Sequence, residues 1–159
     1  MTITVVVIGR AGQSLKGAID EFEGRATRYW KLRVVQLPSG TGGKGKGEAG
    51  RVLKQEEEAI LKKVPDGAEV VALTRGGSLM SSPEFSEYLQ NLALRSVQNV
   101  VFVVGGAFGL GAGVIKRANR ALALSAGTLP HELARLVLAE QLYRAGTIAR
   151  NEPYHKGSK

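Results

Sequence analysis

Residues 99–113 read NVVFVVGGAFGLGAG and join the most hydrophobic run of the chain to a cluster of glycines. The five consecutive apolar residues within Asn99–Val104 predict a strand that is buried on both faces of a sheet. Glycine allows positive φ angles and lets a ligand approach the backbone closely. Because ligands of open α/β sheets bind outside the carboxyl ends of the strands, we expect a ligand-binding loop at 105–113.

The rest of the chain alternates between strand and helix patterns. Further strands are expected at Thr2–Ile8, 32–37, 70–73 and 121–124. Helices are expected at 15–30, with Ser14 as the N-cap, and at 48–63, 112–119 and 131–150. Another helix begins at Ser81-Ser82-Pro83-Glu84, which has capping-box spacing and a proline in the first turn. This alternation predicts an α/β fold: a parallel sheet flanked by helices on both faces, in a single domain of residues 1–159.

The composition excludes several classes of protein. With 159 residues and 43% hydrophobic content, the chain can bury a core. Cysteine is absent, which excludes disulfides, catalytic thiolates and zinc–thiolate sites. The two histidines, His131 and His155, are too few for a histidine-based metal cluster. The start MTITVVVIGR lacks the pattern of a signal peptide, and no apolar stretch reaches the roughly 18 residues of a membrane-spanning helix. We therefore expect a cytoplasmic protein without a metal or membrane partner.

The charge is strongly positive and unevenly distributed. The formal net charge is +8, and the isoelectric point is near 10.0. Residues 1–50 contribute +4, residues 51–110 contribute −1 and residues 111–159 contribute +5. Solubility alone would explain a basic chain. Two basic ends around a neutral middle, however, favour a polyanionic partner, most simply a nucleic acid.

A second glycine-rich segment, GTGGKGKGEAG at 40–50, predicts a mobile loop over 38–50. The loop is either a plain linker or a lid in which Lys44 and Lys46 bind RNA phosphates. The spacing Gly40-x4-Gly45-Lys46 falls one residue short of a P-loop, because Gly47 replaces the hydroxyl residue that would hold magnesium. No register of 105–113 gives the dinucleotide motif G-x-G-x-x-G, and the chain has no G-x-S-x-G element. Rossmann and hydrolase sites are therefore disfavoured.

The last third of the chain carries several sequence blocks in a fixed order. They are Gly105-Gly106-x-x-Gly109-Leu110, Leu124-Ser125-x-x-Thr128-Leu129-Pro130-His131, Arg135, Glu140-Gln141-x-Tyr143-Arg144-Ala145 and Pro153-Tyr154-His155-Lys156. Together with the N-terminal strand that ends in Ile8-Gly9, these blocks resemble the RlmH-type family of ribosomal large-subunit pseudouridine N3-methyltransferases, within the SPOUT class. The resemblance spans nearly the whole chain.

This resemblance implies a C-terminal trefoil knot, a homodimer and S-adenosyl-L-methionine as the cofactor. The knot and the cofactor region would occupy about residues 100–159. The implied reaction is methylation of N3 of a pseudouridine in 23S rRNA, on the large ribosomal subunit or the assembled ribosome. The implied cofactor contacts are Leu73, Thr74, Gly105, Gly106, Leu124, Ser125, Ala126, Gly127, Thr128, Leu129 and Pro130.

The polar residues of the final helix and tail form the candidate catalytic set: His131, Arg135, Arg144, Tyr154, His155 and Lys156. His155 or His131 is a candidate acceptor for the N3 proton. The cations would stabilise negative charge that develops on the carbonyl oxygens of the base, and Tyr154 could stack on it. His131 and Arg135 share a helix face. Arg144 has an alternative partner in Glu140, four residues earlier.

The predicted helix 131–150 is apolar on two sides. Leu133, Leu136 and Val137 project on one side, and Leu138 and Leu142 on the other. Such a helix is either covered by the sheet and a second subunit, or completely buried within one chain. The alternative function is a non-catalytic ribosome-binding or assembly factor that keeps the knotted fold but does not bind the cofactor.

Overall fold

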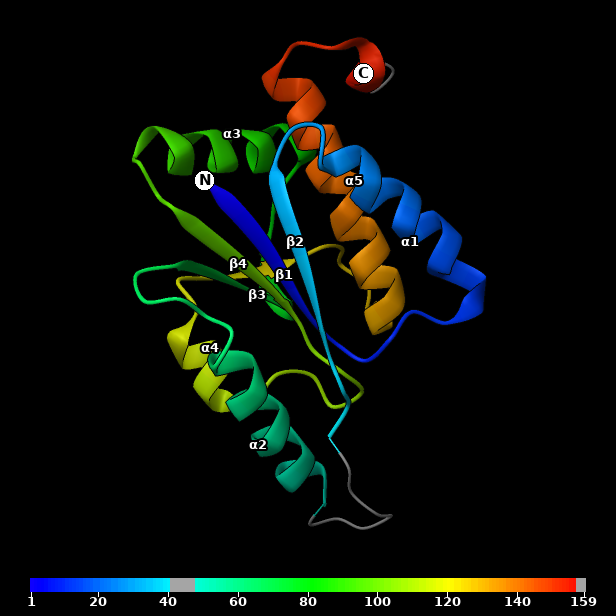
Figure 1. Ribbon diagram of the computed structural model, residues 1–159, viewed down its shortest axis with the longest axis vertical. Helices are drawn as coiled ribbons and strands as arrows, with labels where there is room; N and C mark the ends of the chain where they lie inside the picture. Colours follow the sequence, from blue (N-terminus) through cyan, green and yellow to red (C-terminus); the bar gives the residue numbers. More distant parts are fainter. Residues whose placement is uncertain (41–47, 157–159) are drawn as a thin grey trace.

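The computed structural model of the chain describes residues 1–40 and 48–156. Within these residues, parallel strands form one sheet in the order β2-β1-β4-β3-β5 (Figure 1). The strands are β1 (Thr2–Ile8), β2 (Lys31–Leu37), β3 (Glu69–Leu79), β4 (Asn99–Val104) and β5 (Arg120–Ala123). The helices are α1 (Gln13–Ala26), α2 (Glu48–Leu61), α3 (Ser82–Leu94), α4 (Ala112–Arg117), α5 (His131–Ala149) and the short 3-10 helix η1 (Pro153–His155). The predicted parallel α/β sheet is therefore confirmed.

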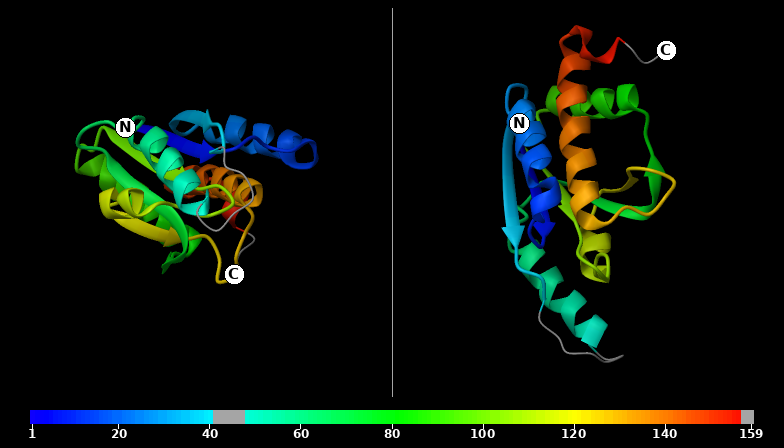
Figure 2. Two further views of the ribbon diagram at one scale, coloured as in Figure 1. Left: turned by 90° about the horizontal axis from the view of Figure 1, so that it is seen from below. Right: turned by 90° about the vertical axis from the view of Figure 1, so that its right-hand side faces the viewer.

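Helices cover both faces of the sheet, which explains the unbroken apolar runs in its central strands. In β1, Ile3, Val5 and Val7 pack into one core with residues of α1, α3 and α5. Val6 and Ile8 point the other way and pack with residues of α2 and α4. These two helices lie away from α1, α3 and α5 (Figure 2). Successive side chains of a strand alternate between faces, so one apolar run supplies two cores.

Strand β3 is longer than the predicted 70–73, because it continues to Leu79. Leu122 of β5 pairs with Leu73 and again with Ser78, so residues 74–77 leave the ladder and return to it. At Gly77, a Cβ atom would lie 2.6 Å from backbone atoms of Leu122, a distance that only glycine avoids. The extension depends on pairing with a strand that comes much later in the chain. The local sequence, which lacks a strand pattern, therefore did not predict it.

The first helix begins differently from the prediction. Ser14 lies inside α1, and Gly12 occupies the N-cap position without a side-chain hydrogen bond of its own. The backbone N–H of Gly12 donates instead to Oε1 of Glu132 at 2.7 Å. The prediction of Ser14 as the N-cap was wrong, because a carboxylate from the distant helix α5 binds this end of α1.

The start of α3 follows its local sequence. The backbone N–H of Glu84 donates to the Ser81 hydroxyl at 3.3 Å, and the Ser81 N–H donates to the Glu84 carboxylate at 2.6 Å. The bond that the Ser81 N–H donates to the carboxylate is the largest cause of a lowered pKa at Glu84. The predicted capping box is confirmed. Among the described residues, no helix has the length and apolar character needed to cross a bilayer.

Candidate functional site

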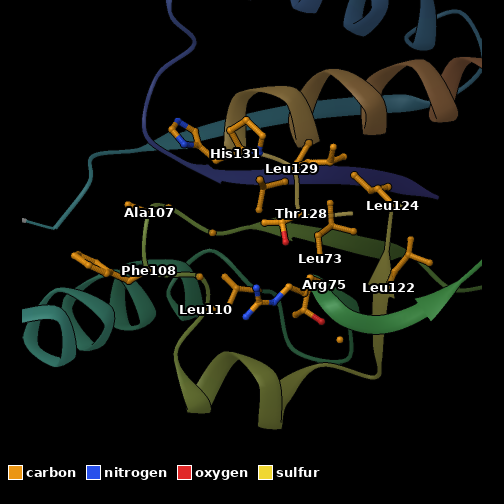
Figure 3. A pocket seen from close by; sticks show the side chains of 18 residues that line it. Leu73, Arg75, Ala107, Phe108, Leu110, Leu122, Leu124, Thr128, Leu129 and His131 are labelled. Atoms are coloured by element: carbon orange, nitrogen blue, oxygen red, sulfur yellow. The ribbon is translucent and has the colours of Figure 1, made fainter. Parts of the chain in front are cut away.

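A cavity of about 900 Å³ lies at the carboxyl ends of β4 and β5, beside the bulge in the middle of β3 (Figure 3). Its wall comes from three separate parts of the chain: residues 73–76, residues 104–110, and residues between 122 and 134. The strand order brings these segments together, because β4, β3 and β5 are neighbours in the sheet. The glycine loop that follows β4 therefore lies at the cavity, at the edge of the sheet where a ligand was expected.

The cavity combines apolar side chains with exposed backbone. Leu73, Leu122, Leu124 and Leu129 project into the same space (Figure 3). On the glycine loop, a Cβ atom at Gly105 would lie 2.5 Å from a carbonyl oxygen of the same loop, so no larger residue fits without a backbone shift. Such a surface suits a flat, largely apolar ring whose edge hydrogen-bonds to backbone groups.

Most of the predicted cofactor contacts line this cavity. They are Leu73, Thr74, Gly105, Gly106, Leu124, Thr128, Leu129 and Pro130. Ser125, Ala126 and Gly127 are not among the lining residues, and the Ser125 hydroxyl donates to the carbonyl oxygen of Gly127 at 2.7 Å. These three residues form the outer turn of the loop.

Sequence reasoning missed other residues that line the cavity, notably Arg75, Phe108, Leu110, Leu122 and Ala134. Phe108 is 54% exposed, although it is a large aromatic residue. The position of this aromatic residue inside a glycine cluster could have indicated that Phe108 lines a ligand site. Arg75 gave no such signal, because it reaches the cavity through the unexpected extension of β3.

His131, from the candidate catalytic set, lies at the N-terminus of α5 and lines the cavity. It packs against the turn after β1. A Cβ atom at Gly9 would lie 3.2 Å from Nε2 of His131, and Gly9 has a φ of +89°, which favours glycine. The imidazole therefore lies beside the chain that follows β1, at the start of α5 (Figure 3).

Arg135 follows one helical turn later but borders a different space. Its Nε donates to Oε1 of Glu23 at 2.7 Å and its Nη2 donates to Oε2 at 3.2 Å. Only 6% of Arg135 is exposed. It lines a second cavity, of about 600 Å³. The structure thus separates His131 from Arg135, although the two residues share a helix face.

The far end of α5 carries a closed cluster of polar and aromatic groups. Arg144 donates through Nε to Oε1 of Glu140 at 2.9 Å, so the alternative ion pair is present. The Tyr154 hydroxyl donates to the same oxygen at 3.1 Å. The guanidinium carbon of Arg144 lies 4.8 Å from the centroid of the Tyr154 ring. The centroid of the Tyr143 ring lies 4.6 Å from the same Tyr154 centroid. Burial, with a contribution from Glu140, raises the pKa of Tyr154.

The candidate catalytic residues therefore fall into two groups within one chain. Arg144 follows His131 by 13 residues of helix, which corresponds to about 20 Å along the axis. Lys156 is exposed at the end of the tail, beyond α5. The side chain of His155 and the lysines Lys44 and Lys46 lie outside the part of the chain that the structure describes.

One apolar side of α5 remains only partly covered. Leu138 and Leu142 are fully buried against the sheet. Leu133, Leu136 and Val137 are only partly buried. Complete burial of the helix within one chain is therefore not what the structure shows. Within residues 1–40 and 48–156, no group of three or more potential metal ligands is present.

Comparison with known proteins gives the class of this fold and site. Residues 1–155 match the family described as predicted SPOUT methyltransferases. The fold is similar to that of a probable methylase family protein from Haemophilus influenzae Rd KW20, with a TM-score of 0.55 and 14% identity over 96% of this chain and 70% of that chain. At this identity the structural similarity concerns the fold alone.

More similar sequences are also known. A Gemmatimonas aurantiaca protein named ribosomal RNA large subunit methyltransferase H is 47% identical over 157 residues, which cover 98% of this chain and all of the relative. A Clostridium perfringens protein, ribosomal RNA large subunit methyltransferase H 1, is 41% identical over 159 residues with the same coverage. The chain therefore belongs to the SPOUT methyltransferase family and, within it, to the ribosomal RNA large subunit methyltransferase H group.

Proposed function

We propose that this protein is a cytoplasmic, S-adenosyl-L-methionine-dependent methyltransferase that modifies N3 of a pseudouridine in 23S rRNA of the large ribosomal subunit. The observation that carries the proposal is the cavity at the carboxyl ends of β4 and β5, beside the bulge in β3, with its apolar walls and glycine backbone. The names of the relatives, which are 41–47% identical, support ribosomal RNA as the substrate.

The residues of the main cavity fit the proposed cofactor. Leu73, Leu124 and Leu129 would hold the adenine ring between apolar side chains, and Gly105 and Gly106 line the same cavity. A volume of about 900 Å³ is sufficient for a nucleoside with an amino-acid tail. When bound, S-adenosyl-L-methionine supplies an electrophilic methyl group.

The protein's own task is to orient the base and to remove a proton. His131 at the cavity would accept the proton from N3 of the base, and His155 of the tail is the second candidate for this role. Arg144 and Lys156 would stabilise negative charge on the neighbouring carbonyl oxygens. Tyr154, which is 37% exposed, would stack on the base.

The proposal includes a homodimer. Within one chain, the tail cluster around Arg144 and Tyr154 lies about 20 Å along α5 from His131. The partly exposed Leu133, Leu136 and Val137 offer an apolar surface between the two groups. A second copy packed on this surface would bring its tail toward the cavity of the first and complete the catalytic set.

The proposal also includes the C-terminal trefoil knot and a basic RNA-binding surface. Residues 74–77 leave the ladder beside β5, and a Cβ atom at Gly77 would lie 2.6 Å from the backbone of Leu122, so these two segments lie against each other in the region of the proposed knot. The charges of +4 and +5 on the first 50 and last 49 residues, with Lys44 and Lys46 among them, would bind rRNA phosphates.

Two measurements test the proposed function. Calorimetry with S-adenosyl-L-methionine should show saturable binding, and mass mapping of ribosomal RNA should show one new methyl group on a pseudouridine after incubation with ribosomes that lack it. His131→Ala and His155→Ala should both retain cofactor binding. The histidine whose replacement abolishes methyl transfer is the proton acceptor. Binding of ribosomes without cofactor binding would instead support the non-catalytic assembly factor.

A further inference from the structure

The second cavity lies at the same edge of the sheet as the main one, at the carboxyl ends of β1 and β2. Ile8 and Leu37 pair at the last position of these strands, and the backbone N–H of Gly9 donates to the carbonyl oxygen of Leu37 at 2.8 Å. Its volume of about 600 Å³ is in the range of small-ligand sites. Both its position in the fold and its size therefore suit a ligand.

The two cavities are separated by one shared wall. His131 and Ala134 of α5 line the main cavity, whereas Arg135 of the same helix lines the second. Gly9 packs against the imidazole of His131, and the next residue, Arg10, already lines the second cavity. The proposed function places the target base beside His131, at the margin of the main cavity. A polymer with one unit there would have a neighbouring unit close to the second cavity.

The charges at the second cavity favour an anion. Arg135 is paired with Glu23, and Lys16 is paired with Asp20 at 2.5 Å, so these two pairs are neutral overall. Arg10 is exposed and makes no hydrogen bond or ion pair with any residue that the structure describes. It leaves one uncompensated positive charge at the opening, which matches a single phosphate group.

The remaining wall offers the contacts that a nucleoside needs. Leu37 and Pro38 provide apolar surface for a ring face, and the Gln36 side chain provides both a donor and an acceptor for a base edge. The floor is rigid, because the Arg135–Glu23 pair has two hydrogen bonds and is largely buried. Phosphate, ring face and base edge together describe a nucleotide.

We infer that the second cavity binds one nucleotide of the substrate RNA next to the modified base, with Arg10 on its phosphate and the ring against Leu37 and Pro38. The inference rests on the proposed function, since it assumes an RNA substrate whose target base lies beside His131. It adds a recognition site that would fix the register of the RNA, so that one base rather than its neighbour lies beside His131.

The first test compares Arg10→Ala with Arg95→Ala, in methyl transfer to large ribosomal subunits that lack the modification. Arg95 is an exposed cation at the end of α3, at the opposite edge of the sheet. Arg10→Ala should raise KM roughly tenfold, as expected for loss of a charged hydrogen bond. It should also lower the salt dependence of RNA binding by about 1 in the log–log slope. The kcat, cofactor affinity and sedimentation should stay unchanged, and Arg95→Ala should behave as wild type.

The second test fills the cavity without a change of charge. Gln36→Trp places a large side chain on an exposed position of β2 and should raise KM to a similar extent. The inference is overturned by equal effects of Arg10→Ala and Arg95→Ala, by a normal KM for Gln36→Trp, or by a changed oligomeric state of Arg10→Ala. It is also overturned if uridine 5′-monophosphate binds as tightly as the RNA, because the site would then serve a free nucleotide.

Filter binding of a ribosomal RNA hairpin separates this inference from the proposed function. If the wild-type protein transfers no methyl group but Arg10→Ala still weakens RNA binding, the proposed reaction fails and the RNA site stands. If transfer is normal and both variants bind RNA as the wild type does, the reaction stands and the site fails.

Discussion

The two ends of α5 carry similar residue types but use them differently. At the N-terminal end, His131 borders an open cavity together with leucines and glycine backbone. At the C-terminal end, Glu140, Arg144 and Tyr154 bind one another through hydrogen bonds and ring contacts. The first arrangement leaves room for a ligand within its own chain. The second leaves no cavity of its own, and in the proposed dimer it would face the cavity of the partner chain. Within one chain, a histidine, arginine or tyrosine therefore borders a ligand site only where its partners leave it accessible.

The largest expected effect on stability concerns Arg135. It lies one turn beyond His131, but it forms an ion pair, as Arg144 does at the C-terminal end of α5. Arg135→Ala would leave the Glu23 carboxylate largely buried without its partner and should lower the free energy of unfolding by about 3–5 kcal/mol. Urea denaturation measures this loss. The double variant Arg135→Met with Glu23→Leu should recover most of it, because no uncompensated charge remains. A loss below about 1 kcal/mol for Arg135→Ala would remove the structural role assigned to the pair.

An intermediate effect is expected at the open end. Gly105→Ala forces a Cβ atom to within 2.5 Å of the carbonyl oxygen of Gly109, so the loop must shift. Unfolding free energy should fall by about 1–3 kcal/mol, and calorimetry should show a loss of affinity for S-adenosyl-L-methionine.

Gly24→Ala is the matched control for Gly105→Ala. It adds the same methyl group in open space on α1 and should stabilise the helix by up to about 1 kcal/mol. Its cofactor affinity should equal that of the wild type. Normal cofactor affinity for Gly105→Ala as well would mean that the glycine loop does not form the cofactor site.

The smallest effect is expected in the tail cluster. Tyr154→Phe removes the hydroxyl that donates to Glu140 but keeps both ring contacts, so unfolding free energy should fall by about 0.5–1 kcal/mol. The pKa of Tyr154 is raised in the folded chain, so its neutral form is favoured there. Its contribution to stability is therefore complete below the unfolded-state pKa of about 10 and is lost as pH rises through the folded-state pKa.

Urea titrations at pH 8 and at pH 11 check this dependence. The difference in unfolding free energy between wild type and Tyr154→Phe should shrink at the higher pH. A difference that stays constant would show that the hydroxyl makes no bond that depends on its proton.

The sequence predicted local features well where neighbouring residues decide them. The apolar runs of β1 and β4 were placed with their observed bounds, and the Ser81–Glu84 capping box depends on four adjacent residues. The extension of β3 and the cap at Gly12 were missed, because each depends on a partner far away in the chain: Leu122 for β3 and Glu132 for Gly12.

By itself, the sequence determined the α/β class, the parallel sheet and the glycine loop at the end of β4, because apolar periodicity and glycine act locally. The tertiary structure alone decided which polar residues border a cavity. Spacing of four residues put His131 and Arg135 on one helix face, but the turn after β1 divides that face between two cavities. Helix periodicity fixes direction around an axis, whereas the surroundings of a side chain are set by every other segment that packs against it.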